Sequence, residues 1–471
     1  MVALVLLLAI LAQLPHLSDD AWEDEAATLM LFASHDAAHA FSDYSLPNNH
    51  MLFSAALSLW WSPGESVSSA RLVPAASWLL SMVLMIVCGR RLLGWPATAL
   101  GIALWTGGAL TAVFAIALRG YGFSWPWTLI LMISAQRFIV DGQRRAGLAY
   151  VVASFICLAI LPTNAMVVAV SVACSVLLAI QINGTLPRAV LGRAALALAS
   201  GLLGALVYLP HRAQLLGHMH NGFSHWSSAE VLGHWLLASS APYWPLLPLM
   251  VYGAWLMGTA SPANASRDSR CALALAASLV LVVPVAVLLS PTPLVPRALV
   301  PLLPVWCLAG GGLLVPAATR LAAFWRWPLM QTFAALTLLC FGLGRLMPAC
   351  GGVVWQFPPG DDLCHQFYRN DYRPSLLLHT LDKAYPGVPV LIESRDVWAI
   401  FFAQRNFDNQ RVLLIDTAGW RRSLSSRSPQ LVVSSNPIAA RALAKQVTAR
   451  QPRAVRQLLD SGVLKLYTLE W

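Results

Sequence analysis

The chain has 471 residues, of which 58% are hydrophobic and 11% charged, and its mean hydropathy is +0.63. Soluble domains usually carry about 25% charged residues, so the composition excludes an ordinary soluble enzyme or nucleic-acid binder. The formal net charge is +10, but the charges are unevenly distributed. Residues 1–348 contain 16 basic groups, all arginine, and 11 acidic groups, whereas residues 349–471 contain 15 basic groups, including all three lysines, and 10 acidic groups. The sequence thus predicts a membrane domain, 1–348, and a soluble domain, 349–471.

Eleven segments of the membrane domain are apolar enough to cross a bilayer as helices, which takes roughly 20 residues each. The first begins at Met1 without a basic region or a clear cleavage site, which favours an anchor over a removed signal peptide. The predicted crossings are 1–17, 71–88, 97–118, 121–140, 146–161, 163–181, 190–210, 244–258, 271–290, 296–315 and 329–347.

The arginines predict the orientation, because basic residues concentrate in cytoplasmic loops. With a cytoplasmic N-terminus, 11 arginines lie inside and five outside. Counting the short segment 50–61 as a twelfth crossing would move Arg90 and Arg91 outside, so we interpret it as a helix on the outer interface, where Trp60 and Trp61 suit the boundary. The odd number of crossings places the loop 18–70 and the C-terminal domain on the outer face of a plasma membrane.

Carboxylates cluster in the first outer loop. Seven of the 11 acids of the membrane domain lie between positions 19 and 43: Asp19, Asp20, Glu23, Asp24, Glu25, Asp36 and Asp43. A solvated loop with helix-capping residues is one interpretation. However, apolar residues recur at helical spacing from Ala26 to Ala33, which places Asp24 and Glu25 on a helix close to the membrane. A functional acid pair is therefore as well supported as a solvated loop.

This loop resembles the first outer loop of the GT-C glycosyltransferases. The resemblance rests on WEDEA at 22–26 and on DYSLPNNHMLF at 43–53, in which Met51 replaces the proline usual after the histidine. It indicates the protein O-mannosyltransferase and aminoarabinose-transferase-like branch, which uses polyprenyl-phosphate sugars. Three further segments resemble the same branch in order, so the resemblance spans 1–348. They are Arg71-Leu72-Val73-Pro74, Arg119-Gly120-Tyr121 and Pro296-Arg297 with Pro301 and Pro304, where Ala298 replaces a tyrosine.

The resemblance implies transfer of a sugar from its lipid phosphate to an acceptor hydroxyl. Such a reaction needs a base for the hydroxyl proton and cationic or hydrogen-bonding groups for the departing phosphate. Asp24 is the predicted base, because the first acid of the family's pair has that role, and attack from the opposite face inverts the anomeric centre. Glu25 either orients Asp24, binds sugar or acceptor, or is itself the base.

Three outer arginines are candidates for the donor phosphate. Arg71, Arg119 and Arg297 each lie at the outer end of a predicted crossing, and arginine binds phosphate bidentately while staying charged. The alternative is that each extends its side chain to the interface without binding anything. Tyr121 is a candidate for a further hydrogen bond to the phosphate, and His50 for one to the substrate.

The sequence gives weaker evidence of a functional role for two asparagines and for a histidine-rich loop. Asn48 and Asn49 are candidates for contacts with sugar hydroxyls, although asparagines after a proline are often turn residues. The outer loop 211–243 holds five of the 11 histidines, and we favour a mobile loop over the substrate cleft to a metal site there. The five histidines are His211, His218, His220, His225 and His234. No cofactor is predicted, and dependence on a divalent cation stays open.

The C-terminal segment alternates strand-like and helix-like runs, which predicts a small extracytoplasmic α/β domain. Cys350 and Cys364 are both predicted outside, where a disulfide between them is possible. The predicted strands are 387–394, 411–417, 429–435 and 463–471, and the predicted helices are 375–385, 396–404 and 437–450.

Two other functions fit a polytopic membrane protein. A transporter or flippase of lipid-linked saccharides should show intramembrane charges and interrupted helices in both halves of the chain. We find no internal repeat, and the acids crowd into one loop instead. A lipid-sugar-binding subunit with a vestigial acid pair is disfavoured by the intact Asp24-Glu25. The enzyme is therefore the preferred hypothesis, with a polyprenyl-phosphate sugar and an unidentified protein, lipid or glycan acceptor as its partners.

Overall fold

In a computed structural model, the chain folds into two compact units. Unit 1 comprises Met1–Leu17, His35–Trp60 and Ala70–Phe357, and unit 2 comprises Ser18–Ser34, Trp61–Ser69 and Pro358–Trp471. The structure describes residues 1–18, 21, 23–44, 49–63, 65–214, 227–259, 266–290, 294–350, 374–385, 388, 390–392, 412–414, 431–434, 440–442, 445, 452–460 and 465–470.

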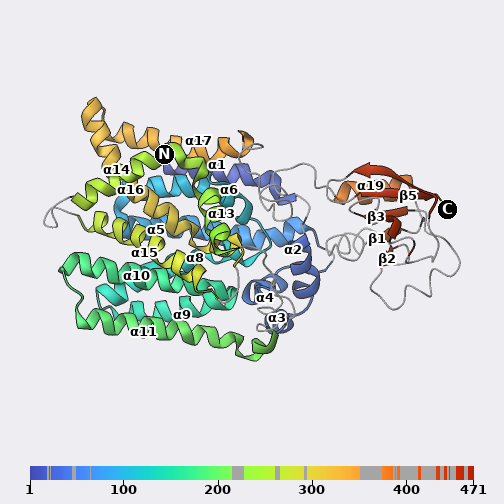
Figure 1. Cartoon of the computed structure of the whole chain (residues 1–471), viewed down its shortest axis with the longest axis horizontal. Coiled ribbons are helices and arrows are strands. Elements are labelled where there is room, and N and C mark those ends of the chain that lie inside the picture. Colours follow the sequence, from blue (N-terminus) through green and yellow to red (C-terminus); the bar gives the residue numbers. More distant parts are fainter. Residues whose placement is uncertain are drawn as a thin grey trace. The chain divides into compact units, whose positions relative to one another are not determined.

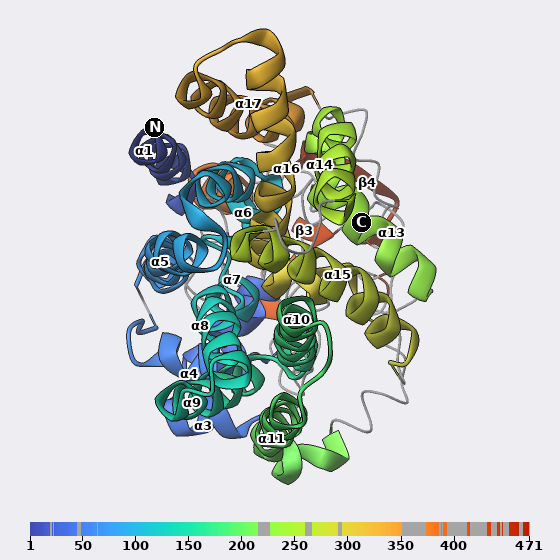
Figure 2. The same ribbon diagram turned by 90° about the vertical axis from the view of Figure 1, so that its left-hand side faces the viewer.

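Unit 1 is built from helices (Figure 1). In Figure 2, α8 to α11 gather on one side, and α14, α15 and α16 pack against one another. The helices of its described part are α1 (Val2–Gln13), α3 (Ala37–Ser42), α4 (Met51–Ser58), α5 (Val67–Gly107), α6 (Ala109–Phe114), α7 (Gly120–Phe123), α8 (Trp125–Ala135), α9 (Arg144–Ile160), α10 (Ala165–Asn183), α11 (Arg188–Gly204), α13 (Ser228–Ser240), α14 (Leu247–Thr259), α15 (Arg267–Leu288), α16 (Leu303–Trp325) and α17 (Leu329–Cys350).

Among the described residues, five helical stretches are long and apolar enough to cross a membrane, judged by length and composition. Two shorter apolar helices, Val2–Ser18 and Leu329–Arg345, match the first and last predicted crossings. Each of the eleven predicted segments contains helix, which confirms a helical membrane protein, while the number of crossings stays a prediction. The five stretches are Val67–Gly107, Pro162–Asn183, Arg188–Gln214, Arg267–Leu288 and Pro296–Trp325.

Helix α5 covers the predicted crossing 71–88 and the first half of the predicted crossing 97–118. It is interrupted at Gly94, whose φ of 76° lies in the left-handed region that glycine adopts without steric cost. A Cβ on Gly89 would lie 2.9 Å from Cγ2 of Thr98, so the chain folds back on itself at Gly94, which lies between these two residues. The helix then ends at Gly107 and α6 starts at Ala109, so the extended Gly108 interrupts the predicted crossing 97–118.

Two segments of the expected outer loops form helices. Segment 50–61 forms the short helix α4, in which Met51, Phe53 and Leu57 have no exposed surface. Just after the helix, Trp60 is 55% exposed and Trp61 is buried, so the place of this segment at the membrane interface stays a prediction. At eight residues the helix is about 12 Å long and too short to cross a bilayer. The expected loop 211–243 contains α13, because its apolar residues find partners on α15.

Helices α14 and α16 approach closely at a glycine, which yields a test of the packing. A Cβ on Gly253 would overlap the carbonyl oxygen of Leu313, whereas one on Gly258 of the same helix meets nothing within 4 Å. We expect Gly253→Ala to force the helices apart and to cost about 1–3 kcal/mol of stability, as overpacking does. Gly258→Ala is the matched control and should be neutral or slightly stabilising. Thermal unfolding in detergent measures both, and equal melting temperatures would contradict this helix contact.

Unit 2 contains the helix α2 (Glu23–Ala27), a π-helical turn at Thr28–Ala33 and a five-stranded sheet. The strand order is β2-β1-β3-β5-β4. Strands β2, β1 and β3 are parallel to one another, β5 is antiparallel to β3, and β4 is antiparallel to β5. The described elements of this part are α19 (Pro374–Ala384), β1 (Val390–Ile392), β2 (Val412–Leu414), β3 (Leu431–Ser434), β4 (Ala454–Asp460) and β5 (Lys465–Glu470).

The four predicted strands and the helix at 375–385 are present in the sheet domain. Leu391, Val432, Tyr467 and Leu469 form its apolar core with Ala440. Strand β4 was not predicted, because its residues AVRQLLD lack a regular alternation of apolar and polar side chains. The predicted helix 396–404 and the pairing of Cys350 with Cys364 depend on residues outside the described part of the chain.

Candidate functional site

His50 is the centre of a buried polar cluster in unit 1. It directly precedes α4, and only 2% of its surface is exposed. Its Nδ1 accepts a hydrogen bond of 2.5 Å from the backbone N–H of Gly120, at the start of α7. A Cβ on Gly120 would lie 2.8 Å from that nitrogen, so the close approach requires glycine. The predicted Arg-Gly-Tyr motif thus contacts the predicted His50 through its backbone.

Two of the predicted arginines act on this histidine. Burial lowers the pKa of His50 well below its ordinary value, and the positive charges of Arg119 and Arg297 lower this pKa further. The imidazole is therefore neutral, with Nδ1 as acceptor and the proton on Nε2. Arg119 and Arg297 are 178 residues apart in sequence, but both lie close enough to influence one buried ring.

Tyr121 joins the same cluster. Its ring meets the His50 ring edge to face at 4.8 Å between centroids, and the Arg119 guanidinium lies 5.7 Å from the Tyr121 centroid. Arg119 itself is 2% exposed and is the residue that precedes helix α7. Arg297 is partly exposed, in the 3-10 turn Pro296–Leu302 that leads into α16. His50 and Arg119 thus both pack against Tyr121, and the turn that carries Arg297 packs against α7, so these four predicted residues are candidates for one site.

Arg71 lies in a different environment. It is fully buried in the first turns of α5, and its Nη1 donates to the carbonyl oxygens of His16 at 3.0 Å and of Leu17 at 3.3 Å. These carbonyls end the first helical segment, where a cation compensates the exposed C-terminal ends of peptide dipoles. These hydrogen bonds give Arg71 a structural role, and its role toward phosphate stays a prediction.

The side chain of Asn49 forms hydrogen bonds within its own segment of the chain. Its amide nitrogen donates to the carbonyl oxygens of Ala40 and Asp43, and its amide oxygen accepts from the Ser54 hydroxyl at 2.7 Å. With 2% of its surface exposed, Asn49 joins the end of α3 to the first half of α4. Asn48 lies outside the described residues. The expected contact with sugar hydroxyls is therefore untested for both asparagines.

The acid pair belongs to unit 2 and lies on the helix α2 that the sequence predicts. Asp24 is half-buried, whereas Glu25 has no exposed surface. The helix continues into the π-helical turn, where the Thr28 hydroxyl donates to the carbonyl oxygen of Asp24. Adjacent residues on a helix point about 100° apart, which explains why one carboxylate is accessible and the other is not.

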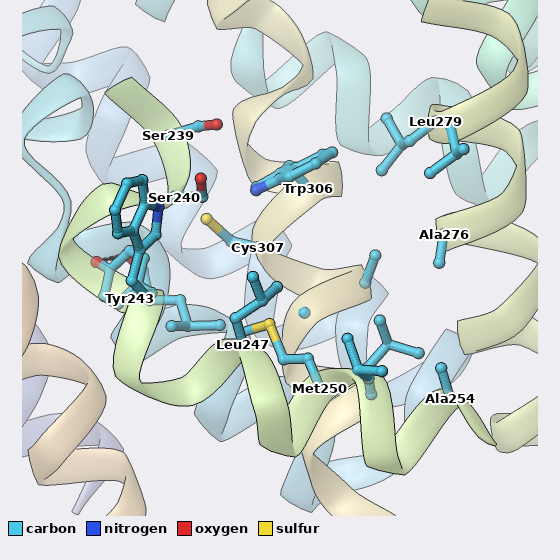
Figure 3. A pocket seen from close by; sticks show the side chains of 17 residues that line it. Ser239, Ser240, Tyr243, Leu247, Met250, Ala254, Ala276, Leu279, Trp306 and Cys307 are labelled. Carbon is cyan, nitrogen blue, oxygen red and sulfur yellow. Dashed lines mark hydrogen bonds between the residues drawn. The ribbon is translucent and has the colours of Figure 1, made fainter. Parts of the chain in front are cut away.

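Unit 1 also contains an apolar cavity of about 220 Å³. Figure 3 shows its lining side chains converging from the end of α13, the 3-10 turn Ala241–Leu246, and helices α14, α15 and α16. Its wall includes Leu247, Met250, Ala276, Leu279 and Trp306. Most of the wall is apolar, and Ser239, Ser240 and Tyr243 are its polar members, so the cavity suits a hydrocarbon chain better than a sugar.

Sequence reasoning missed two residues that support the cluster. Trp125 is fully buried, and its Nε1 donates to the carbonyl oxygen of Val300 at 2.9 Å. Asn164 is also fully buried and donates to the Ser124 hydroxyl and to the carbonyl oxygen of Cys157. The only sequence signal was their proximity to the Arg-Gly-Tyr motif and to a helix break at Pro162.

Among the described residues, no group of three or more His, Cys, Asp or Glu side chains is arranged to hold a metal ion. Three of the five histidines of the 211–243 loop, at 218, 220 and 225, lie outside the described residues. His211 contacts Gln214, and its ring lies 6.0 Å from that of Tyr44. Metal dependence therefore stays open.

Comparison with known proteins identifies the fold. No family model matches the sequence, and no curated protein does. The chain is similar to two crystal structures of ArnT from Cupriavidus metallidurans. The apo structure is 16% identical with a TM-score of 0.58, and the structure bound to undecaprenyl phosphate is 14% identical with a TM-score of 0.55. Both likenesses cover 99% of this chain and 97% of the other. The chain therefore has the GT-C fold of these aminoarabinose transferase structures over nearly its whole length, as its sequence motifs predict.

Proposed function

We propose that the protein is an integral-membrane glycosyltransferase. It transfers a sugar from a polyprenyl-phosphate donor to an acceptor hydroxyl on the outer face of the membrane, with inversion at the anomeric carbon. In this proposal the N-terminus is cytoplasmic, and the loop 18–70 and residues 349–471 are extracytoplasmic. The membrane is the plasma membrane, and the acceptor is a protein, lipid or glycan.

The observation that carries the proposal is that His50 and Arg119 both pack against Tyr121, while the 3-10 turn that carries Arg297 packs against α7. Two guanidinium groups near one neutral, hydrogen-bonded ring concentrate positive charge in a domain that contains few charged residues. Arginine binds phosphate bidentately, so phosphate is an anion that suits such a site. A protein of the same fold has been crystallised with undecaprenyl phosphate. A polyprenyl phosphate is thus the donor chemistry that fits the cluster, with Tyr121 supplying a further hydrogen bond.

Asp24 is the proposed general base. A base must reach the acceptor hydroxyl from the aqueous side, and Asp24 is partly exposed whereas Glu25 is fully buried. A carboxylate in that position can take the proton of the acceptor hydroxyl. The buried Glu25 then orients the helix that carries Asp24. As the sugar leaves, the arginines stabilise the negative charge that develops on the phosphate.

The apolar cavity supports a lipid donor, and we propose that it accommodates part of the isoprenoid chain. We expect Ala276→Phe to place a ring in the cavity and to weaken undecaprenyl phosphate binding about tenfold, since two displaced methylene equivalents cost about 0.8 kcal/mol each. Binding of the ten-carbon geranyl phosphate should not change. Ala149→Phe, on an exposed position of α9, is the matched control. Equal weakening of undecaprenyl phosphate binding and geranyl phosphate binding would mean that the isoprenoid chain lies outside this cavity.

The experiment that tests the function is sugar release from a panel of radiolabelled polyprenyl-phosphate sugars by the purified full chain, with a crude acceptor extract present. Consumption of one donor supports the enzyme and identifies the sugar. If no donor is consumed while a lipid-linked sugar crosses reconstituted vesicles, the alternative transporter or flippase is correct.

A further inference from the structure

One buried hydrogen bond joins the two segments that carry the cluster's arginines. Trp125 lies six residues after Arg119, and Val300 lies three residues after Arg297. The indole Nε1 of Trp125 donates to the carbonyl oxygen of Val300 at 2.9 Å, and both residues are buried. The two segments are otherwise distant in sequence, so this bond fixes how the start of α8 meets the 3-10 turn Pro296–Leu302.

The sequence explains why the Val300 carbonyl accepts an outside donor. In an uninterrupted α-helix, this carbonyl would receive the backbone N–H four residues later, but that residue is Pro304, which has no N–H. From its own helix, the carbonyl accepts the N–H of Leu303. Its second lone pair is therefore available, and the indole of Trp125 uses it.

The Trp125 side of the bond is held rigidly. Its ring is fully buried and meets the Trp105 ring edge to face at 5.2 Å. The preceding Ser124 donates its hydroxyl to the carbonyl oxygen of Gly120, and Asn164 donates to the same hydroxyl. Gly120 follows Arg119 directly, so these bonds connect the indole to the Arg119 backbone through a short, buried path.

We propose that Trp125 is a positioning residue that sets the spacing of Arg119 and Arg297 for a lipid phosphate. The inference rests on the proposed function, because it assigns the two arginines to the donor phosphate. Bidentate binding by two guanidinium groups depends on their separation, and small displacements of a positioned group reduce its effect strongly. Trp125 does not touch the phosphate in this proposal and acts through Arg297.

The test is equilibrium binding of undecaprenyl phosphate to the full chain in nanodiscs. Trp125→Phe keeps an aromatic ring and removes the N–H, and we expect about fivefold weaker binding, the effect of one lost hydrogen bond. In an Arg297→Gln background the same change should alter affinity less than about 1.5-fold, because two residues that act through one contact are not additive. Trp78→Phe is the matched control, since the buried Nε1 of Trp78 has no hydrogen-bond partner among the described residues, and it should leave binding unchanged.

A second variant leaves Trp125 intact. Pro304→Ala restores a backbone N–H that competes for the Val300 carbonyl, and it should weaken binding in the same direction as Trp125→Phe. An equal loss from Trp125→Phe in both backgrounds would show a general packing role and overturn the inference, as would unchanged binding by both Trp125→Phe and Pro304→Ala. If the wild type does not bind, or if Arg297→Gln binds as well as the wild type, the proposed phosphate site fails and the inference fails with it.

Discussion

Asp24→Asn is expected to abolish sugar transfer while donor binding persists. The amide is nearly isosteric with the carboxylate but cannot take the proton of the acceptor hydroxyl, and loss of a general base costs about 10²–10⁴ in rate. Donor binding should persist because the proposed phosphate contacts come from arginines in another part of the chain. Single-turnover release of labelled sugar, measured beside equilibrium binding of the same donor, separates the two effects.

Two neighbouring carboxylates provide the controls. Asp36 caps helix α3 by accepting the N–H of His39 at 2.8 Å, so Asp36→Asn removes a charge from the same loop without removing a proposed base. It should retain transfer within about threefold, because asparagine also caps helices well. Glu25→Gln tests the other acid of the pair. Full activity in Asp24→Asn together with inactivity in Glu25→Gln would transfer the base role to Glu25.

The fold was predictable because its signals are local. Long apolar runs such as 163–181 and 271–290 permit little besides helix, and the ordered motifs around Asp24, Arg119 and Arg297 were enough to indicate the GT-C fold. Helix ends were less predictable. Nothing in the apolar pattern of 97–118 distinguishes a continuous helix from one that ends at Gly107, because the break depends on how α17 packs there: a Cβ on Gly107 would lie 2.8 Å from the Phe341 carbonyl.

The candidate site was predictable in part. The types of residue that bind phosphate are recognisable, and His50, Arg119, Tyr121 and Arg297 do cluster. Their supporting residues were not recognisable, because Trp125 acts through a carbonyl 175 residues away, and no single-sequence pattern encodes such a contact. The same limit applies to Asn49, whose internal hydrogen bonds become visible only in the folded loop.

Arg119→Gln is expected to lower kcat/KM by about 10²–10³, the usual cost of removing one donor from a site where negative charge develops. The guanidinium is almost fully buried beside Tyr121, so water cannot easily replace it. Because burial is the largest cause of the lowered pKa of His50, loss of one neighbouring charge should leave that ring neutral. The measured loss then reports on the arginine alone. Arg119→Lys should be intermediate, since lysine keeps the charge but not the bidentate geometry.

The matched control is an arginine at the opposite predicted end of the helices. Arg193 donates from Nε to the carbonyl oxygen of Ile139 at 2.9 Å, so Arg193→Gln also removes a hydrogen-bonded guanidinium from a helix terminus. We expect this variant to lose some thermal stability and to keep kcat/KM within about twofold. Similar kcat/KM losses in the two variants would mean that Arg119 supports the fold in general. A loss below about threefold in Arg119→Gln would move the phosphate away from this cluster, whereas a large loss confined to Arg119 makes the cluster around His50 the place where the donor's charge is stabilised.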